Sequence, residues 1–340
     1  MQTISITVVT TAAIAASAMP AAHAESMRLL YSQWLPAQHH TQVKIRNYFK
    51  DIEKATQGRV KIRASAKALG PPPRQLQLAI DGVADVAWGV HSYQPGVYPL
   101  AEMVELPFVS TGVLANSVAY WKVYQTYFSK AAFHPKGVHT LALHVNPPGN
   151  VYTTKRAIER GADMKGLKLR ATNRGVFGLF RHFGAVAISP AGGVLALNQG
   201  LAKGVMDGTT FTDDGILTFH LQKYIKHATH VPGGLYNTSF YMVINKKKWD
   251  AMTAADRKAI AALGGVRFAR ILGADWDNQV AAAEPKLAKA GVKITTAGPE
   301  FMAELRKAAA PLRAGWIQKA NKLGVDGAAA LRMYTVESNK

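Results

Sequence analysis

The chain has 340 residues, of which 48% are hydrophobic, and this is enough for two lobes of ordinary domain size. It contains no cysteine, which excludes thiol nucleophiles, Cys-ligated zinc, iron–sulfur clusters, disulfides and a lipid-modified cysteine. Lys and Arg number 41 against 21 Asp and Glu, so the formal net charge is +20. Because the basic residues are scattered along the chain, we interpret this charge as a solvated surface that attracts anions rather than as a nucleic-acid interface.

The first 24 residues have the pattern of a secretory signal peptide. They contain no Lys, Arg, Asp or Glu, have an apolar core over 4–18, and end in the small-x-small sequence Ala22-His23-Ala24. We expect cleavage after Ala24 and a mature protein in the periplasm. A retained membrane anchor is the less favoured alternative, because threonines interrupt the apolar run.

The first half of the mature sequence alternates between strand and helix patterns. Ile45, Tyr48, Phe49 and Ile52 form one apolar stripe, which is typical of an amphipathic helix, and Gly58 follows as its C-terminal cap. We expect strands at 27–32, 60–64 and 85–88, and helices at 41–57 and 71–82.

The second half repeats this alternation. Leu167 and Leu169 alternate with Lys168 and Arg170, as in a strand with one buried face, so we expect Arg170 at the strand end, at the mouth of a cleft. We expect helices at 176–184 and 193–203, strands at 186–188 and 236–245, and a long helical stretch that Thr253 caps, that breaks at Gly264-Gly265 and that ends near residue 283, ahead of Pro285.

These alternations predict two α/β lobes. Two strands, near 141–145 and 240–244, would cross between the lobes. We expect one lobe to comprise residues 25–146 and 240–280, the other to comprise 147–239 and 281–335, and a ligand cleft to lie between them.

Several short motifs resemble those of the DctP-type extracytoplasmic solute-binding proteins of TRAP transporters, in that family's order and over nearly the whole mature chain. They are Gly58-Arg59-Val60-Lys61-Ile62, Asp85-Val86-Ala87-Trp88, Tyr93-Gln94-Pro95-Gly96, Glu105-Leu106-Pro107-Phe108, Lys165-Gly166-Leu167-Lys168-Leu169-Arg170 and residues 245–249.

The resemblance implies an α/β fold of the type II periplasmic-binding-protein kind, with crossover strands and a long C-terminal helix. It also implies capture of an organic acid anion and delivery to the small and large membrane subunits of a TRAP transporter. In that family the arginine at the position of Arg170 clamps the ligand carboxylate. A guanidinium suits this role, because its planar fork matches the two carboxylate oxygens. A surface ion pair is the alternative role for Arg170.

Departures from the family pattern narrow the expected ligand. Phe211 stands where many relatives have an asparagine, and Val151 stands where sialic-acid binders have an extra arginine. The resemblance therefore favours 2-oxo or 2-hydroxy monocarboxylates over sugar acids or short dicarboxylates as ligands. Some of these monocarboxylates have an apolar or aromatic tail. The other expected ligand contacts, each of which has an ordinary core or polar-loop role as its alternative, are Trp34, His39, Trp88, Tyr93, Asn146, Asn173, Asp214, Tyr236 and Asn237.

We expect no enzymatic activity, cofactor or metal site. The chain lacks a nucleophile elbow, a zinc-protease helix, a dinucleotide fingerprint and a phosphate loop. His227 and His230 could share a helical face, but no third ligand accompanies them. A cation that joins Asp213 or Asp214 to the ligand is a less favoured alternative to a polar loop.

Two less favoured functions also fit these patterns. One is that of a ligand-presenting partner of a membrane sensor, and the second is that of a periplasmic enzyme on the same fold. The sequence does not decide between a monomer and a homodimer.

Overall fold

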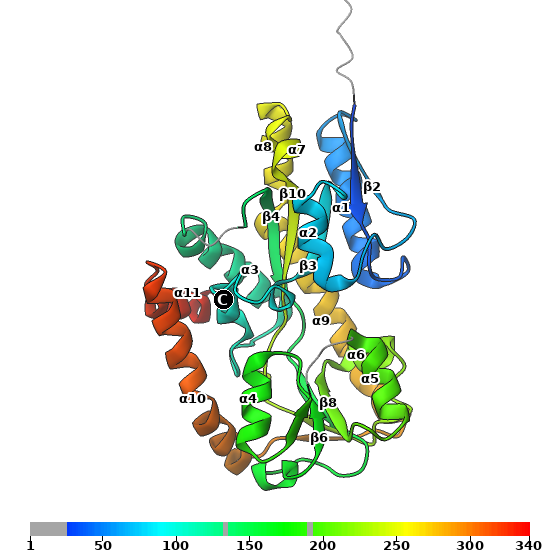
Figure 1. The fold of residues 1–340 in the computed structure, drawn as a ribbon, viewed down its shortest axis with the longest axis vertical. Helices are drawn as coiled ribbons and strands as arrows, with labels where there is room; N and C mark the ends of the chain where they lie inside the picture. The colour runs from blue at the N-terminus through cyan, green and yellow to red at the C-terminus, as the bar shows by residue number, and fades with distance from the viewer. Residues whose placement is uncertain (1–25, 132–134, 189–192) are drawn as a thin grey trace, which may run out of the picture.

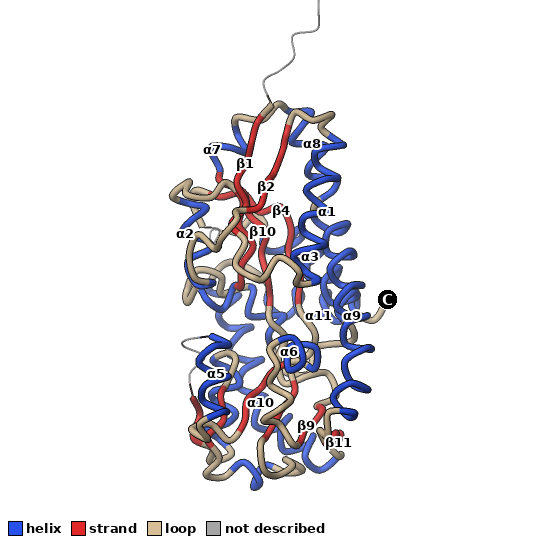
Figure 2. The backbone as a smooth tube through the Cα atoms, turned by 90° about the vertical axis from the view of Figure 1, so that its right-hand side faces the viewer, coloured by secondary structure: helices blue, strands red, loops and turns tan. Residues whose placement is uncertain are grey.

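The computed structural model describes residues 26–131, 135–188 and 193–340, so the expected signal peptide lies outside the described part of the chain. Two mixed β-sheets form two lobes, one above the other in Figures 1 and 2. This confirms the predicted α/β class with two lobes.

The first sheet has five strands in the order β2-β1-β3-β10-β4. Its strands are β1 (Met27–Ser32), β2 (Val60–Ala64), β3 (Val86–Val90), β4 (Val138–Val145) and β10 (Ser239–Asn245). Strand β1 is parallel to β2 and β3, whereas β10 runs antiparallel to β3 and β4. The helices of this part of the fold are α1 (His40–Ala55), α2 (Gln75–Ile80), α3 (Val113–Val123), α7 (Lys246–Asp250) and α8 (Ala254–Leu263).

The second sheet has six strands in the order β11-β9-β5-β8-β6-β7. Its strands are β5 (Asn150–Thr153), β6 (Lys168–Arg170), β7 (Val186–Ile188), β8 (Gly208–Phe211), β9 (His227–His230) and β11 (Lys293–Thr296). The accompanying helices are α4 (Arg174–His182), α5 (Gly193–Ala202), α6 (Asp213–Thr218) and α10 (Pro299–Lys322).

Helix α9 (Gly265–Lys289) packs against both lobes, on α3 and β4 of the first and on α6 of the second. Figure 2 shows it along one side of the molecule. Helix α10 packs on α4 and leads back to α11 (Gly327–Ser338), which packs on α3 (Figure 1). The two long helices α9 and α10 therefore connect the lobes, together with the chain segments that follow β4 and precede β10.

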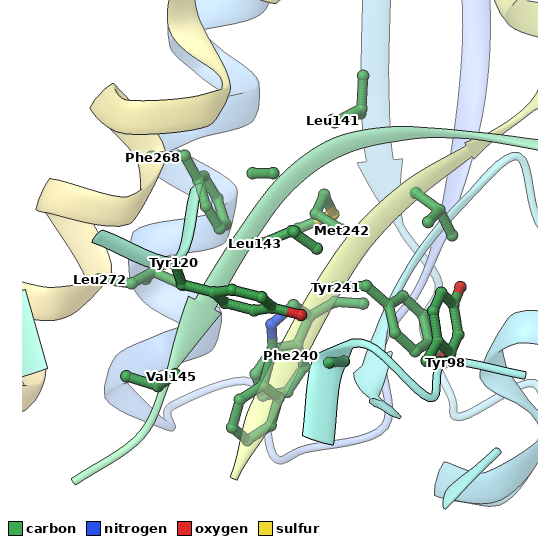
Figure 3. Close-up of a cluster of buried hydrophobic side chains, with 14 of the residues drawn as sticks. Tyr98, Tyr120, Leu141, Leu143, Val145, Phe240, Tyr241, Met242, Phe268 and Leu272 are labelled. Carbon is green, nitrogen blue, oxygen red and sulfur yellow. The ribbon is translucent and has the colours of Figure 1, made fainter. Parts of the chain in front are cut away.

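The core of the first lobe forms where strand β4, which pairs with β10, packs against α3 and α9. Leu143 on β4 and Met242 on β10 are buried beside Phe268 and Leu272 of α9, and Tyr120 of α3 closes the cluster (Figure 3). Burial of large apolar side chains contributes about 1.5–3 kcal/mol each. This core thus packs β4, and with it its partner strand β10, against α9.

Most predicted elements are confirmed within a few residues, including the break between α8 and α9 at Gly264. One boundary is wrong, because α9 continues through Pro285 to Lys289. Leu287, in the turn after the proline, is fully buried in the apolar cluster of the second lobe, and this burial favours the extra turn over the lost backbone hydrogen bond.

Across the described residues, none of the helices has the length and apolar character that crossing a membrane requires.

Candidate functional site

Strand β6 places Arg170 at the boundary between the lobes. Leu169 is fully buried in the core of the second lobe, and Arg170, the next residue, is directed to the other face of the sheet. It is also buried, with 4% of its surface exposed, and it lines a cavity of about 120 Å³ between the lobes. The strand thus places a cation in the cavity between the lobes.

The cavity brings together nine of the residues predicted from the sequence. They are Trp34, His39, Trp88, Tyr93, Asn146, Arg170, Phe211, Asp214 and Tyr236. Further lining residues, which the prediction missed as ligand contacts, include Ser92, Thr172, Thr212, Phe219, Thr238 and Trp276. Thr172 lies two residues after Arg170, so its position in the cavity lining could have been predicted from the sequence. Trp276 lies on α9, far along the chain, and no local pattern points to it.

Arg170 forms no ion pair with a carboxylate in the described part of the chain. Its Nη1 atom is buried and has no hydrogen-bond partner there. Burial lowers the pKa of Arg170, and Tyr236 and Tyr93 partly offset this shift. A guanidinium nevertheless stays protonated at any physiological pH. The cavity therefore contains a buried positive charge whose desolvation is only partly compensated, and an anion would supply a partner for it.

Stacked aromatic rings form one wall. Trp34 lies on Trp88 with ring centroids 5.0 Å apart, and Trp88 lies on Phe240 with centroids 4.8 Å apart. Trp34 Nε1 donates to the Trp88 carbonyl at 2.7 Å, and Trp88 Nε1 donates to His144 Nε2 at 2.9 Å. Because both indole donors are satisfied within the protein, the wall presents an apolar surface to the cavity.

The second lobe contributes a further aromatic pair. Phe211 and Phe219 meet edge to face, with centroids 5.9 Å apart. The guanidinium carbon of Arg170 lies 6.0 Å from the centroid of Phe211. The cavity can thus bind the apolar body of a ligand between aromatic residues while the anionic end reaches Arg170.

Hydroxyl and amide groups complete the lining near Arg170. Thr172 Oγ1 is 3.0 Å from Tyr236 Oη, and burial raises the pKa of Tyr236 to about 12. Asn146 Oδ1 accepts from the Thr238 N–H at 2.6 Å, so its amide Nδ2 remains available as a donor.

An aspartate and a histidine also line the cavity. Burial raises the pKa of Asp214 to about 6, although a hydrogen bond from Thr212 opposes the shift. Burial lowers the pKa of His39 to about 4, and its Nδ1 accepts from the Thr41 N–H at 3.3 Å as a cap for α1. His39 is therefore neutral near pH 7.

Residues 31–319 match the sequence profile of the bacterial extracellular solute-binding protein family 7, known as DctP. The chain belongs to this family. It is similar to "Outer membrane transporter protein TsaT" of Comamonas testosteroni, with 30% identity over 331 residues that cover 96% of each chain.

Solved structures of TRAP solute-binding proteins are also similar to this DctP-family chain. One from Bordetella bronchiseptica with bound (R)- and (S)-mandelate is 30% identical, with a TM-score of 0.86 over 92% of this chain and 99% of the other. One from a marine metagenome, with metahydroxyphenylacetate, is 27% identical, with a TM-score of 0.82 over 92% and 99%. One from Rhodoferax ferrireducens with benzoate is 26% identical, with a TM-score of 0.81 over 92% and 98%.

Two predicted ligand contacts of this DctP protein lie outside the cavity lining. Asn173 caps α4, because its side chain accepts from the Val176 N–H at 2.9 Å. Asn237 is fully buried, and its Nδ2 lies 3.3 Å from the Asn146 carbonyl oxygen. Both amides thus serve the backbone.

The polar groups near α6 and β9 form a network within the second lobe. Asp213 Oδ1 accepts from Tyr152 Oη at 2.5 Å and lies 3.0 Å from His230 Nε2. His227 and His230 lie on strand β9, so the expectation that they share a helical face is wrong. Among the described residues, no group of three or more His, Asp or Glu side chains could hold a metal ion.

Proposed function

We propose that this DctP-family protein captures an aromatic monocarboxylate in the cavity between its lobes and delivers it to the membrane subunits of a TRAP transporter. The ligands that fit best are 2-hydroxy and 2-oxo acids with an aromatic ring, and their simpler aromatic relatives. The observation that carries the proposal is the buried guanidinium of Arg170 in a cavity with aromatic walls, whose Nη1 has no hydrogen-bond partner among the described residues.

The size of the cavity supports a single ring. Its volume is about 120 Å³, and an apolar cavity of about 150 Å³ is known to hold benzene. A flat ring between Phe240 and Phe211 would bury both faces, and an aromatic pair adds about 0.5–1.5 kcal/mol beyond area burial. The aromatic acids named for the similar structures, mandelate, metahydroxyphenylacetate and benzoate, have this shape.

The charge of the cavity favours one carboxylate over two. Arg170 can pair with a single carboxylate through two parallel charge-assisted hydrogen bonds. A second carboxylate would enter a space with aromatic walls and the acid Asp214, where it would remain desolvated without a cation. Short dicarboxylates should therefore bind poorly.

The test is thermal unfolding and calorimetry of the mature chain against a panel of acids. The panel contains benzoate, phenylacetate, mandelate, phenylglyoxylate, lactate, succinate and a sugar acid. At a hundredfold excess over Kd a ligand adds about 2.7 kcal/mol, so aromatic monocarboxylates should raise Tm by a few degrees. Stabilisation by succinate or the sugar acid alone would contradict the proposal. Chromatography after incubation should return the acid unchanged, whereas conversion would indicate an enzyme.

A further inference from the structure

Asp214 is a second polar residue in the cavity, and within the described part of the chain its hydrogen-bonding capacity is only partly used, through a bond from Thr212. It lies in the first turn of α6, has 6% of its surface exposed and lines the same cavity as Arg170. Its Oδ1 atom is buried and has no hydrogen-bond partner among the described residues. A buried acceptor without a donor destabilises the protein by about 1–3 kcal/mol, so a ligand that supplies the donor gains that energy on binding.

Among the residues that the structure describes, no Lys, Arg or His side chain forms an ion pair with Asp214. Arg170 lines the same cavity and forms no ion pair with it. The adjacent Asp213 is engaged with Tyr152 and His230. On the first lobe, His40 acts electrostatically on Asp214, and its Nδ1 is 2.6 Å from Asp275 of α9.

The cavity therefore contains a positively charged hydrogen-bond donor, Arg170, and a free acceptor, Oδ1 of Asp214. Among the described residues, these two groups do not form an ion pair with each other. A ligand that fits both has a carboxylate at one position and a hydrogen-bond donor at another. An ionised second carboxylate is excluded, because it would face Asp214 and both groups would lose hydration.

We propose that Asp214 accepts a hydrogen bond from a hydroxyl group of the bound acid, which makes the preferred ligands hydroxylated aromatic monocarboxylates. The proposal rests on the proposed function and adds the chemical group that the second end of the cavity recognises. Sites built to hydrogen-bond a ligand hydroxyl discriminate strongly against the analogue that lacks it, because the protein group then remains buried and unpaired.

The experiment is calorimetry with pairs of acids that differ by one hydroxyl. The pairs are 3-hydroxybenzoate with benzoate, 3-hydroxyphenylacetate with phenylacetate, and mandelate with phenylacetate. A hydrogen bond to a charged group corresponds to roughly a tenfold to hundredfold preference. The wild-type protein should prefer the hydroxylated acid by at least about tenfold in one or more pairs.

Variants of two neighbouring acids separate the role of Asp214 from that of the fold. Asp214→Ala should reduce the preference to about twofold or less, while binding of the acid without the hydroxyl stays within about threefold of wild type. Asp214→Asn, which keeps the shape and removes the charge, should give a smaller reduction and guards against a misfolded alanine variant. Asp213→Asn is the matched control and should keep the preference.

Three outcomes overturn the proposal. The first is a wild-type protein that binds benzoate and 3-hydroxybenzoate equally, which would leave the proposed function intact. The second is a hydroxyl preference that survives in both Asp214 variants. The third is a preference for 3-aminobenzoate over 3-hydroxybenzoate that depends on Asp214. If no aromatic acid binds the wild-type protein, the proposed function itself fails.

Discussion

Replacement of Arg170 by methionine should change stability and binding in opposite directions. Methionine keeps the length of the side chain but removes a charge that is buried without a partner in the described protein. Replacement of buried ionic groups by apolar ones stabilises proteins by about 1–4 kcal/mol. For a chain of this length, 1 kcal/mol corresponds to roughly 1–2 °C, so the Tm of the ligand-free variant should rise by about 2–5 °C.

The same replacement should abolish ligand binding. Two charge-assisted hydrogen bonds from the guanidinium contribute about 1.5–3 kcal/mol each, so their loss weakens affinity by roughly two to four orders of magnitude. Differential scanning calorimetry measures the stability, and isothermal titration with mandelate measures the affinity. Arg174→Met is the control, because Arg174 is exposed one turn along the chain and should leave both quantities unchanged. An Arg170→Met protein that binds within tenfold of wild type would refute the role of this charge.

Three further changes test other parts of the account. Burial raises the pKa of Glu105 from 4.5 to about 7, so the stability that this group contributes is complete below pH 4.5 and is lost as the pH rises from there through 7. The stability of Glu105→Gln relative to wild type should therefore increase by roughly 2–3 kcal/mol from pH 5 to pH 8, as measured by urea unfolding. Trp34→Ala removes the outer ring of the stack on Trp88 and should weaken aromatic acids about tenfold in calorimetry, with little effect on lactate. Gly149→Ala would place Cβ 1.9 Å from Cε1 of Tyr236, so the ring must leave its place in the cavity wall, and both Tm and affinity should fall.

For each of these three variants, one result would contradict the expected effect. A stability difference for Glu105→Gln that is constant from pH 5 to pH 8 would mean that this carboxyl is not held protonated. Equal losses for aromatic acids and lactate in Trp34→Ala would argue against ring stacking. Normal affinity in Gly149→Ala would show that Tyr236 is not needed for binding.

Local sequence patterns predicted the framework because the physical causes are local. Thr253 caps α8 through the Asp256 N–H, and Gly264 separates α8 from α9, as the sequence indicates. The course of α9 beyond Pro285 depends on burial of Leu287 against other elements of the second lobe, and this is tertiary information. His227 and His230 show the same limit, because a spacing of three does not separate a short strand from a helix.

Some of the residues that line the cavity could be predicted from the sequence because local structure fixes their positions. Arg170 and Phe211 lie at the ends of strands, where the backbone directs side chains toward the lobe boundary. Trp276 reaches the cavity from helix α9. No sequence motif shows which side of this helix packs on the first lobe. Asn173 and Asn237 carry the polar groups expected of ligand contacts, but nearby backbone groups engage both.

A crystal structure of the mature protein with a bound aromatic monocarboxylate, such as mandelate, would show directly how the cavity between the lobes holds its ligand. We predict that both carboxylate oxygens lie within hydrogen-bond distance of the Arg170 guanidinium and that the ring lies between Phe240 and Phe211. An acid bound with its carboxylate away from Arg170, or bound outside the cavity between the lobes, would contradict the account.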